Sequence, residues 1–194
     1  AADMSPNGVS SLVQAANAQL KDKWQLADAE LELRTIATNY FFELRTDRIF
    51  LDEYTLKAAE ATGESHTTLT YIANELRLGT NAAPYSMITG VQSSQFDNAP
   101  KGDEMLITEW LAKDLRAKVG DKIDMAYYVL GLNRQLEELR HTFNVTGIVP
   151  TEEPGWRELM PNFPGIVDKD NIRDWNPGID FNSNRIRDQD EDYW

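Results

Sequence analysis

The sequence predicts an α+β fold, in which antiparallel β hairpins form a sheet with a few short helices and a long proline-rich ordered coil follows them. Strand-like alternation of apolar and polar residues recurs in pairs joined by short connections, which is typical of antiparallel hairpins. Apolar residues at helical spacing are confined to short segments. From Pro150 onward, five prolines exclude a long helix or a central strand.

The first elements expected along the chain are a short helix and a hairpin. The helix covers Ser10 to Leu20, because its apolar residues fall on one stripe. Glu30 to Ile36 and Tyr40 to Leu44 both alternate, and the short connection between them favours an antiparallel hairpin. Ile49 to Leu51 continues or follows this hairpin.

A second helix and a second hairpin come next. Asp52 is suited to cap a helix over Glu53 to Ala61, and Gly63 is suited to end it. Two strand-like runs follow, Thr67 to Leu78 and Pro84 to Val91. The turn-forming residues Gly79-Thr80-Asn81 lie between them, and Gln92 to Gly102 then reads as a loop.

The last regular elements are a strand, a helix and another hairpin. Glu104 to Thr108 is a brief strand, and Thr108 is suited to cap a helix that runs to Lys118. Gly120-Asp121 then turns the chain into a strand over Lys122 to Leu130. A polar insert separates this strand from its expected partner, Leu139 to Val149.

These elements predict three regions. Residues 1–29 form a helical lead-in, 30–150 form the α+β core, and 151–194 form an acidic, proline-rich extended segment packed on the core. The last region carries 11 acidic and 5 basic side chains, close to half of the net charge of −13. It also holds several tryptophan, phenylalanine and isoleucine residues, which are too many for a linker.

The composition excludes several classes of function. With 32 acidic against 19 basic side chains, the chain lacks the clustered lysine and arginine that nucleic acid or an anionic membrane surface requires. The absence of cysteine excludes disulfides, thiol catalysis and Cys-ligated metal sites. Two histidines leave little room for His-based catalysis, and no apolar run is long enough to span a bilayer.

The strongest local signal for a ligand is an acidic stretch from Asp180 to Glu191. Its oxygen-bearing side chains fall at the first, third, fifth, ninth and twelfth positions, which is the spacing of a calcium loop, and they are Asp180, Asn182, Asn184, Asp188 and Glu191. The sixth position is Arg185, where the loop needs glycine, and no flanking helix is expected. We therefore interpret the stretch as solvated and assign no metal ligand, while calcium binding stays an open alternative.

Other candidates for chemistry have weaker support. His66 and His141 lie on strand-like segments without the sequence context of a nucleophile, and Ser86 lacks the glycines of a nucleophile elbow. No glycine-rich phosphate loop occurs. Two close carboxylates could act as the acid and base of a hydrolase. Because the chain has 32 acidic residues, some must be neighbours by chance, so such a pair does not indicate an active site. The sequence thus predicts no catalytic residue and no cofactor.

Two further sequence features can be interpreted either as structural or as functional. Trp110, Tyr127 and Tyr128 could line a binding groove, although aromatic residues at this spacing more often lie in a core. Asn144-Val145-Thr146 matches a glycosylation acceptor, but it falls inside an expected strand.

Three stretches together resemble the extracytoplasmic domains of MacB/FtsX-type ABC transporter permeases. Glu104 to Tyr128 resembles the segment of strand, helix, Val-Gly-Asp turn and strand in those domains, the MacB-like periplasmic core. Phe143 to Pro150 is similar to the F-x-V-x-G-I-V strand that follows it, and Leu69 to Val91 is similar to the strand pair before it. The acidic coil at the end is also similar to one in large members of the family. Gly120 suits the turn because it tolerates a left-handed backbone.

The resemblance implies a non-catalytic domain on the extracytoplasmic, periplasmic side of a bacterial cytoplasmic membrane. Such a domain binds a substrate or periplasmic partner and transmits motion driven by a cytoplasmic ABC ATPase, in a permease that works with a second copy. The implied membrane helices lie outside this chain, so the fragment is expected to be soluble. The alternative is a secreted or cell-surface ligand-binding module, with calcium dependence as one version.

Overall fold

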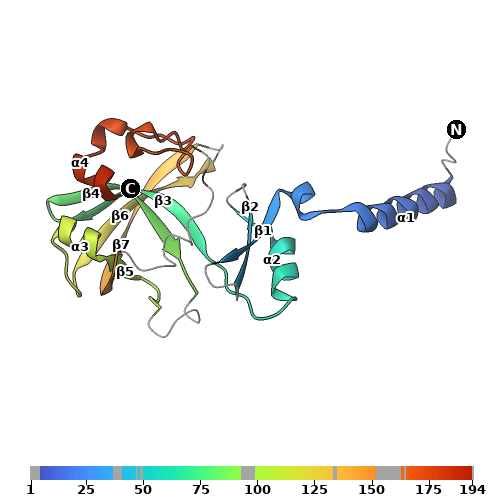
Figure 1. Ribbon diagram of the computed structural model, residues 1–194, viewed down its shortest axis with the longest axis horizontal. Helices are drawn as coiled ribbons and strands as arrows, with labels where there is room; N and C mark the ends of the chain where they lie inside the picture. The colour runs from blue at the N-terminus through green and yellow to red at the C-terminus, as the bar shows by residue number, and fades with distance from the viewer. Residues whose placement is uncertain are drawn as a thin grey trace. The chain divides into compact units, whose positions relative to one another are not determined.

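The computed structural model describes residues 5–36, 41–46, 48, 50–92, 99–132, 135–151, 163 and 165–193. The chain divides into two compact units, Ala1–Arg48 and Ile49–Trp194 (Figure 1).

The first unit contains a helix and a two-stranded antiparallel hairpin. Its elements are α1 (Pro6–Lys23), the 3₁₀ helix η1 (Leu26–Ala29), β1 (Leu31–Ile36) and β2 (Phe41–Thr46). Helix α1 begins before the expected Ser10 because Ser5 accepts a hydrogen bond from the Gly8 amide and Pro6 occupies the first turn. Among the described residues, no helix has both the length and the apolar character that crossing a membrane requires.

The second unit contains one sheet, several short helices and a C-terminal segment. Its elements are α2 (Glu53–Glu60), β3 (Leu69–Leu78), β4 (Asn81–Gly90), β5 (Glu104–Thr108), α3 (Glu109–Leu115), β6 (Lys122–Leu130), β7 (Leu136–Val149), the 3₁₀ helices η4 (Ile172–Asp174) and η5 (Ser183–Arg185), and α4 (Asp188–Tyr193). The α+β class with antiparallel sheets and short helices is confirmed.

The sheet of the second unit has five strands in the order β4-β3-β6-β7-β5. Neighbouring strands are antiparallel except β5 and β7, which run parallel from Glu104 opposite Asn144 to Thr108 opposite Val149. This parallel pair follows from the chain path: β5 leads into α3, and the β6–β7 hairpin then inserts β7 between β6 and β5. The stretches that carry the family resemblance therefore all lie in this one sheet.

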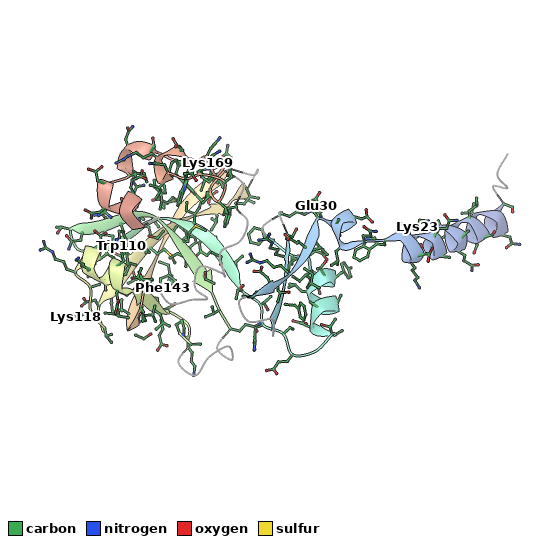
Figure 2. The ribbon with its side chains drawn as sticks, in the orientation of Figure 1. Lys23, Glu30, Trp110, Lys118, Phe143 and Lys169 are labelled. Atoms are coloured by element: carbon green, nitrogen blue, oxygen red, sulfur yellow. The ribbon has the colours of Figure 1, made fainter. Side chains whose placement is uncertain are left out.

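One face of the sheet packs against α3. The buried residues of this core include Leu76 on β3, Leu115 on α3 and Ile123 on β6, each 0% exposed. Thr108 caps α3 through a hydrogen bond from the Leu111 amide, as expected. Figure 2 shows Trp110 and Phe143, two of the partly buried side chains packed against this core.

The other face of the sheet packs against the C-terminal segment, residues 163 and 165–193 (Figure 1). Its core joins strand residues to the segment, and the buried members are Ile72, Tyr85, Phe163, Ile166, Ile172, Trp175 and Ile186. Ile166 is 0% exposed and Trp175 is 5% exposed. Apolar side chains in the segment thus complete a second hydrophobic core.

Candidate functional site

Charged side chains attach the C-terminal segment to the sheet at two places. The first, which we call the Glu75 cluster, consists of Glu75, Arg77, Arg140 and Arg185. The second, the Arg187 cluster, consists of Arg187, Asp114, Asp190 and Gln189. Each joins residues that are far apart in the sequence.

In the Glu75 cluster, one largely buried carboxylate contacts three guanidinium groups. Arg77 donates Nε to Glu75 Oε1 at 2.9 Å, and Arg185 donates Nη2 to Oε2 at 2.9 Å. Nη1 of Arg140 lies 3.5 Å from Oε1. The hydrogen bond from Arg77 is the largest influence that lowers the pKa of Glu75, and the charges of Arg77 and Arg185 act in the same direction. Glu75 is therefore held as a carboxylate.

The guanidinium of Arg185 lies against the ring of Tyr85. Its central carbon lies 5.2 Å from the ring centre of Tyr85, a cation–π arrangement. Tyr85 has a left-handed backbone with φ of +47°, and its hydroxyl accepts a hydrogen bond from the Asn182 amide at 2.8 Å. Burial raises the pKa of Tyr128, and the nearby charge of Asp180 raises it further.

The charges around Glu75 are close to balanced. Glu138 accepts from Arg140 at 3.2 Å, and Asn74 donates to Glu138 at 3.0 Å. Asp180 adds a further negative charge beside Tyr128. Three arginines thus share two carboxylates, Glu75 and Glu138, with the charge of Asp180 nearby. Because little net positive charge remains, the arrangement is suited to clamping the C-terminal segment and not to capturing a free anion.

The Arg187 cluster ties the end of the chain to α3 and β4. Arg187 donates Nη1 and Nη2 to the two oxygens of Asp114 at 3.1 and 2.8 Å, and Nη1 also donates to the Ala82 carbonyl at 3.0 Å. Its Nε donates to Asp190 at 3.0 Å. The side chains of Asp114 and Asp190 are only 7% and 4% exposed. Hydrogen bonds to Asp190 and then to Asp114 raise the pKa of Arg187, which stays fully charged.

The side chains of the calcium-like stretch are engaged in other contacts. The side-chain oxygen of Asn182 accepts from the Asn184 amide and thereby caps η5. Asp188 accepts from Arg173 at 2.8 Å, and Glu191 lies 3.5 Å from Arg173. No group of three or more acidic or histidine side chains in the described residues is placed to hold a metal ion.

The two histidines and Ser86 lie apart from one another along the sheet unit. His66 precedes β3, and its ring nitrogen lies 4.0 Å from Glu64. His141 is on β7, 2.8 Å from Asp103, and its ring contacts Phe143 with the centroids 4.8 Å apart. Ser86 is on β4 opposite Ala73. The Asp103 partner of His141 could not be seen in the sequence because 38 positions separate the two residues.

The aromatic candidates lie on both faces of the sheet. Trp110 and Tyr127 pack against the α3 core, and Tyr127 meets Tyr71 edge to face with the centroids 6.2 Å apart. Tyr128 is the next residue along β6, so its side chain lies on the opposite face of the sheet, near Asp180 and Arg185. Asn144 of the glycosylation triplet pairs with Lys122 on one side and Glu104 on the other, so it is an internal strand position. These three aromatic residues therefore do not share one groove.

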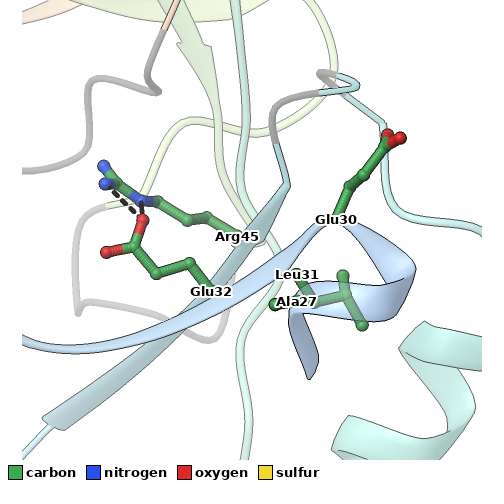
Figure 3. A pocket seen from close by; sticks show the side chains of 5 residues that line it. All are labelled: Ala27, Glu30, Leu31, Glu32 and Arg45. Carbon is green, nitrogen blue, oxygen red and sulfur yellow. Dashed lines mark hydrogen bonds and ion pairs between the residues drawn. The ribbon is translucent and has the colours of Figure 1, made fainter. Parts of the chain in front are cut away.

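The first unit carries an open hollow beside its hairpin (Figure 3). Its lining residues are Ala27, Glu30, Leu31, Glu32 and Arg45. Arg45 donates Nε and Nη2 to Glu32 at 2.8 and 2.6 Å, so the cation in this hollow already has a carboxylate partner. Glu30 binds Arg48, which lowers the pKa of Glu30. The hollow is a weaker candidate than the two clusters on the sheet.

The sequence pattern draws attention to Arg185 only as the sixth position of the calcium-like stretch, and it indicates neither cluster. One signal was available for Glu75, which interrupts the strand-like run Thr67 to Leu78, because a carboxylate buried in a sheet requires a cation. The spacing of Arg187 and Asp190 also fits an ion pair at i, i+3. Neither signal identifies the distant partners.

No protein-family model matches the chain, and a search of curated proteins found no significant match. The family resemblance of the three sheet stretches therefore stays a prediction.

Proposed function

We propose that the chain is a non-catalytic extracytoplasmic domain of an ABC transporter permease, which binds a substrate or periplasmic partner and transmits ATP-driven motion. In this proposal a cytoplasmic ABC ATPase acts through membrane helices that belong to other parts of the parent protein. The proposal places the domain on the periplasmic side of a bacterial cytoplasmic membrane.

The observation that supports the proposal best is the attachment of the C-terminal segment to the sheet. The segment is joined to β3 through Arg185, to β4 and α3 through Arg187, and to the sheet face through a buried apolar core. A force applied near α4 would pass into the sheet through these side chains. A domain that transmits motion needs such a firm connection between its C-terminal segment and its sheet.

A second line of support is the order of the strands. The stretches that resemble the permease domains form β3–β4, β5–α3–β6 and β7, which are neighbours in one sheet with a shared core. The order of these stretches in the sequence thus corresponds to one packed unit.

The gene that encodes the parent protein provides the test. The proposal expects one apolar span before this segment and about three after it, each roughly 20 residues long. Purification of the tagged parent protein from membranes should also recover an ABC ATPase. Flanking sequence without apolar spans, in a protein found free of the membrane, would refute the proposal.

A further inference from the structure

In the described residues, no strand pairs with the outer edge of β7 over residues 136–143, and Asp103 contacts this stretch at His141. Within the part of the chain that the structure describes, β5 pairs with β7 only from Asn144 to Val149, whereas β6 pairs with the opposite edge of β7 from Leu136 onward. Residues 136–142 are exposed. An exposed strand edge presents unpaired backbone N–H and C=O groups, which are a template for another strand.

The sequence of this edge is complementary to itself. It reads Glu137-Glu138-Leu139-Arg140-His141, with two acidic residues, a central leucine, and then an arginine and a histidine. In an antiparallel pair centred on Leu139, this residue faces Leu139 of the second strand, and Glu138 faces Arg140. Glu137 then faces His141, whose ring nitrogen also contacts Asp103 at 2.8 Å. Opposite charges across an antiparallel pair are stabilising, whereas like charges are destabilising.

We propose that the open edge of β7 pairs antiparallel with the same edge of a second copy of this chain, in the register centred on Leu139. A two-fold axis through Leu139 makes every contact occur twice, as a symmetric dimer requires. A shift of one residue places Leu139 opposite Arg140 or Glu138 and removes the match of two acidic residues with two basic residues. The charge pattern therefore selects one register.

The exposure of the side chains agrees with this pairing. Leu139 is 44% exposed, and the side chains of Glu138 and Arg140 are 39% and 53% exposed. Arg140 already contacts Glu138 of its own strand at 3.2 Å and Glu75 at 3.5 Å. A guanidinium has five N–H donors, so Arg140 retains donors for a carboxylate of the second copy.

The expected dimer is weak. Seven paired residues span about 23 Å at the rise of a β-strand. Such a contact buries less than the roughly 1,600 Å² of a standard stable interface, so association is expected to depend on protein concentration. The inference is independent of the proposed transport function: a monomeric domain would leave that proposal standing, and the dimer measurement needs no membrane or ATPase.

Cross-linking through a single introduced cysteine gives the sharpest test, because the chain contains no cysteine. Residues directly opposite one another in an antiparallel pair have Cα atoms about 4.5–5.5 Å apart, which is within disulfide range. Leu139→Cys should therefore form a covalent dimer under mild oxidation. Leu132→Cys is the matched control, because Leu132 is also an exposed leucine in the same hairpin but lies outside the paired edge.

Leu139→Cys should cross-link roughly tenfold or more faster than Leu132→Cys, because association raises the effective concentration of the two thiols. Thr142→Cys should not link to itself, since the register places it opposite Leu136. Equal rates for Leu139→Cys and Leu132→Cys would overturn the proposal, and preferential linking of Thr142→Cys would overturn the register.

Charge reversal tests the pairing without a covalent bond. Glu138→Arg and Arg140→Glu should each weaken self-association roughly tenfold, because each places like charges opposite one another twice. Mixing the two variants should restore association, since the arginine introduced in one variant then faces the glutamate introduced in the other. Sedimentation velocity measures association, and circular dichroism checks that each variant is folded. Two folded variants whose mixture associates no better than either alone would contradict the proposal.

Discussion

Arg187 donates two hydrogen bonds to Asp114, a residue 73 positions earlier, through Nη1 at 3.1 Å and Nη2 at 2.8 Å. The same guanidinium binds Asp190 and the Ala82 carbonyl. One side chain therefore joins the C-terminal segment, β4 and α3. Both carboxylates are almost fully buried, and this guanidinium is the cation that pairs with each of them.

Replacing Arg187 should destabilise the fold strongly. Arg187→Met leaves Asp114 and Asp190 buried without their cation, and breaking such a pair costs about 3 kcal/mol of unfolding free energy. Urea denaturation followed by circular dichroism measures this change. The control is Lys169→Met in the same segment, which should cost much less because its partner Asp168 is 57% exposed. Equal losses in the two variants would show that the Arg187 cluster does not anchor the segment.

The apolar core under the C-terminal segment provides a second test. Ile166→Ala removes a side chain that is 0% exposed, and large-to-small changes at such sites cost roughly 2–5 kcal/mol. Val167→Ala next to it is the matched control. Val167 is 46% exposed, so its truncation should change the unfolding free energy by less than about 1 kcal/mol. Similar urea midpoints for both variants would indicate that the segment does not pack on the sheet as described.

The sheet elements could be predicted because their signals are local. Strand spacing places Ile123, Met125 and Tyr127 on one face of β6, and in the structure all three lie in or pack against the α3 core. Residue type and position predict Thr108 as a helix cap, and its hydroxyl accepts the expected hydrogen bond from the Leu111 amide. These signals need no knowledge of distant residues.

The parts that could not be predicted depend on distant partners. The sequence predicts a polar insert at the start of β7 because Glu137 and Glu138 are poor strand formers, yet pairing with β6 extends the strand to Leu136. The helix expected to reach Lys118 ends at Leu115, because Arg116 adopts a left-handed backbone with φ of +57°. The Glu75–Arg185 contact spans 110 positions, and no local pattern indicates it.

The Glu75 cluster predicts a pH dependence of stability. Hydrogen bonding to Arg77 and the charges of Arg77 and Arg185 lower the pKa of Glu75 below its ordinary value of 4.5 in the folded state. A lowered folded-state pKa contributes stability above the unfolded pKa, and that stability is lost as the pH falls through the folded value. Glu75→Gln should therefore be less stable than the wild type at pH 7, and the difference should shrink below about pH 4.5.

Urea midpoints of the wild type and Glu75→Gln at pH 7, 5 and 3 measure this dependence. Glu64→Gln serves as the control, because the Glu64 side chain is 91% exposed and lies 4.0 Å from its ion-pair partner His66. Glu64→Gln should resemble the wild type at pH 7. A constant difference between Glu75→Gln and the wild type from pH 7 to pH 3 would contradict the assignment of the cluster as a charge-dependent clamp.

Substitutions at two glycines of the C-terminal segment can distinguish the cost of backbone strain from the cost of steric overlap. Gly165 has φ of +80° and Gly178 has φ of +71°, so both adopt a conformation that disfavours other residues. A Cβ atom on Gly165 would also overlap the carbonyl of Asn176, whose amide donates to the Gly165 carbonyl at 2.8 Å. A Cβ atom on Gly178 would meet no atom within 4 Å.

Gly178→Ala should therefore cost only about 1 kcal/mol of unfolding free energy, which is the penalty of a left-handed backbone for alanine. Gly165→Ala adds the overlap with Asn176, so the turn must open and pull on Ile166 beside it. The loss should clearly exceed that of Gly178→Ala in thermal or urea unfolding, and hydrogen exchange should rise across residues 165–176. Equal losses in the two variants would mean that the turn relaxes freely, and the segment would then be a poor path for force.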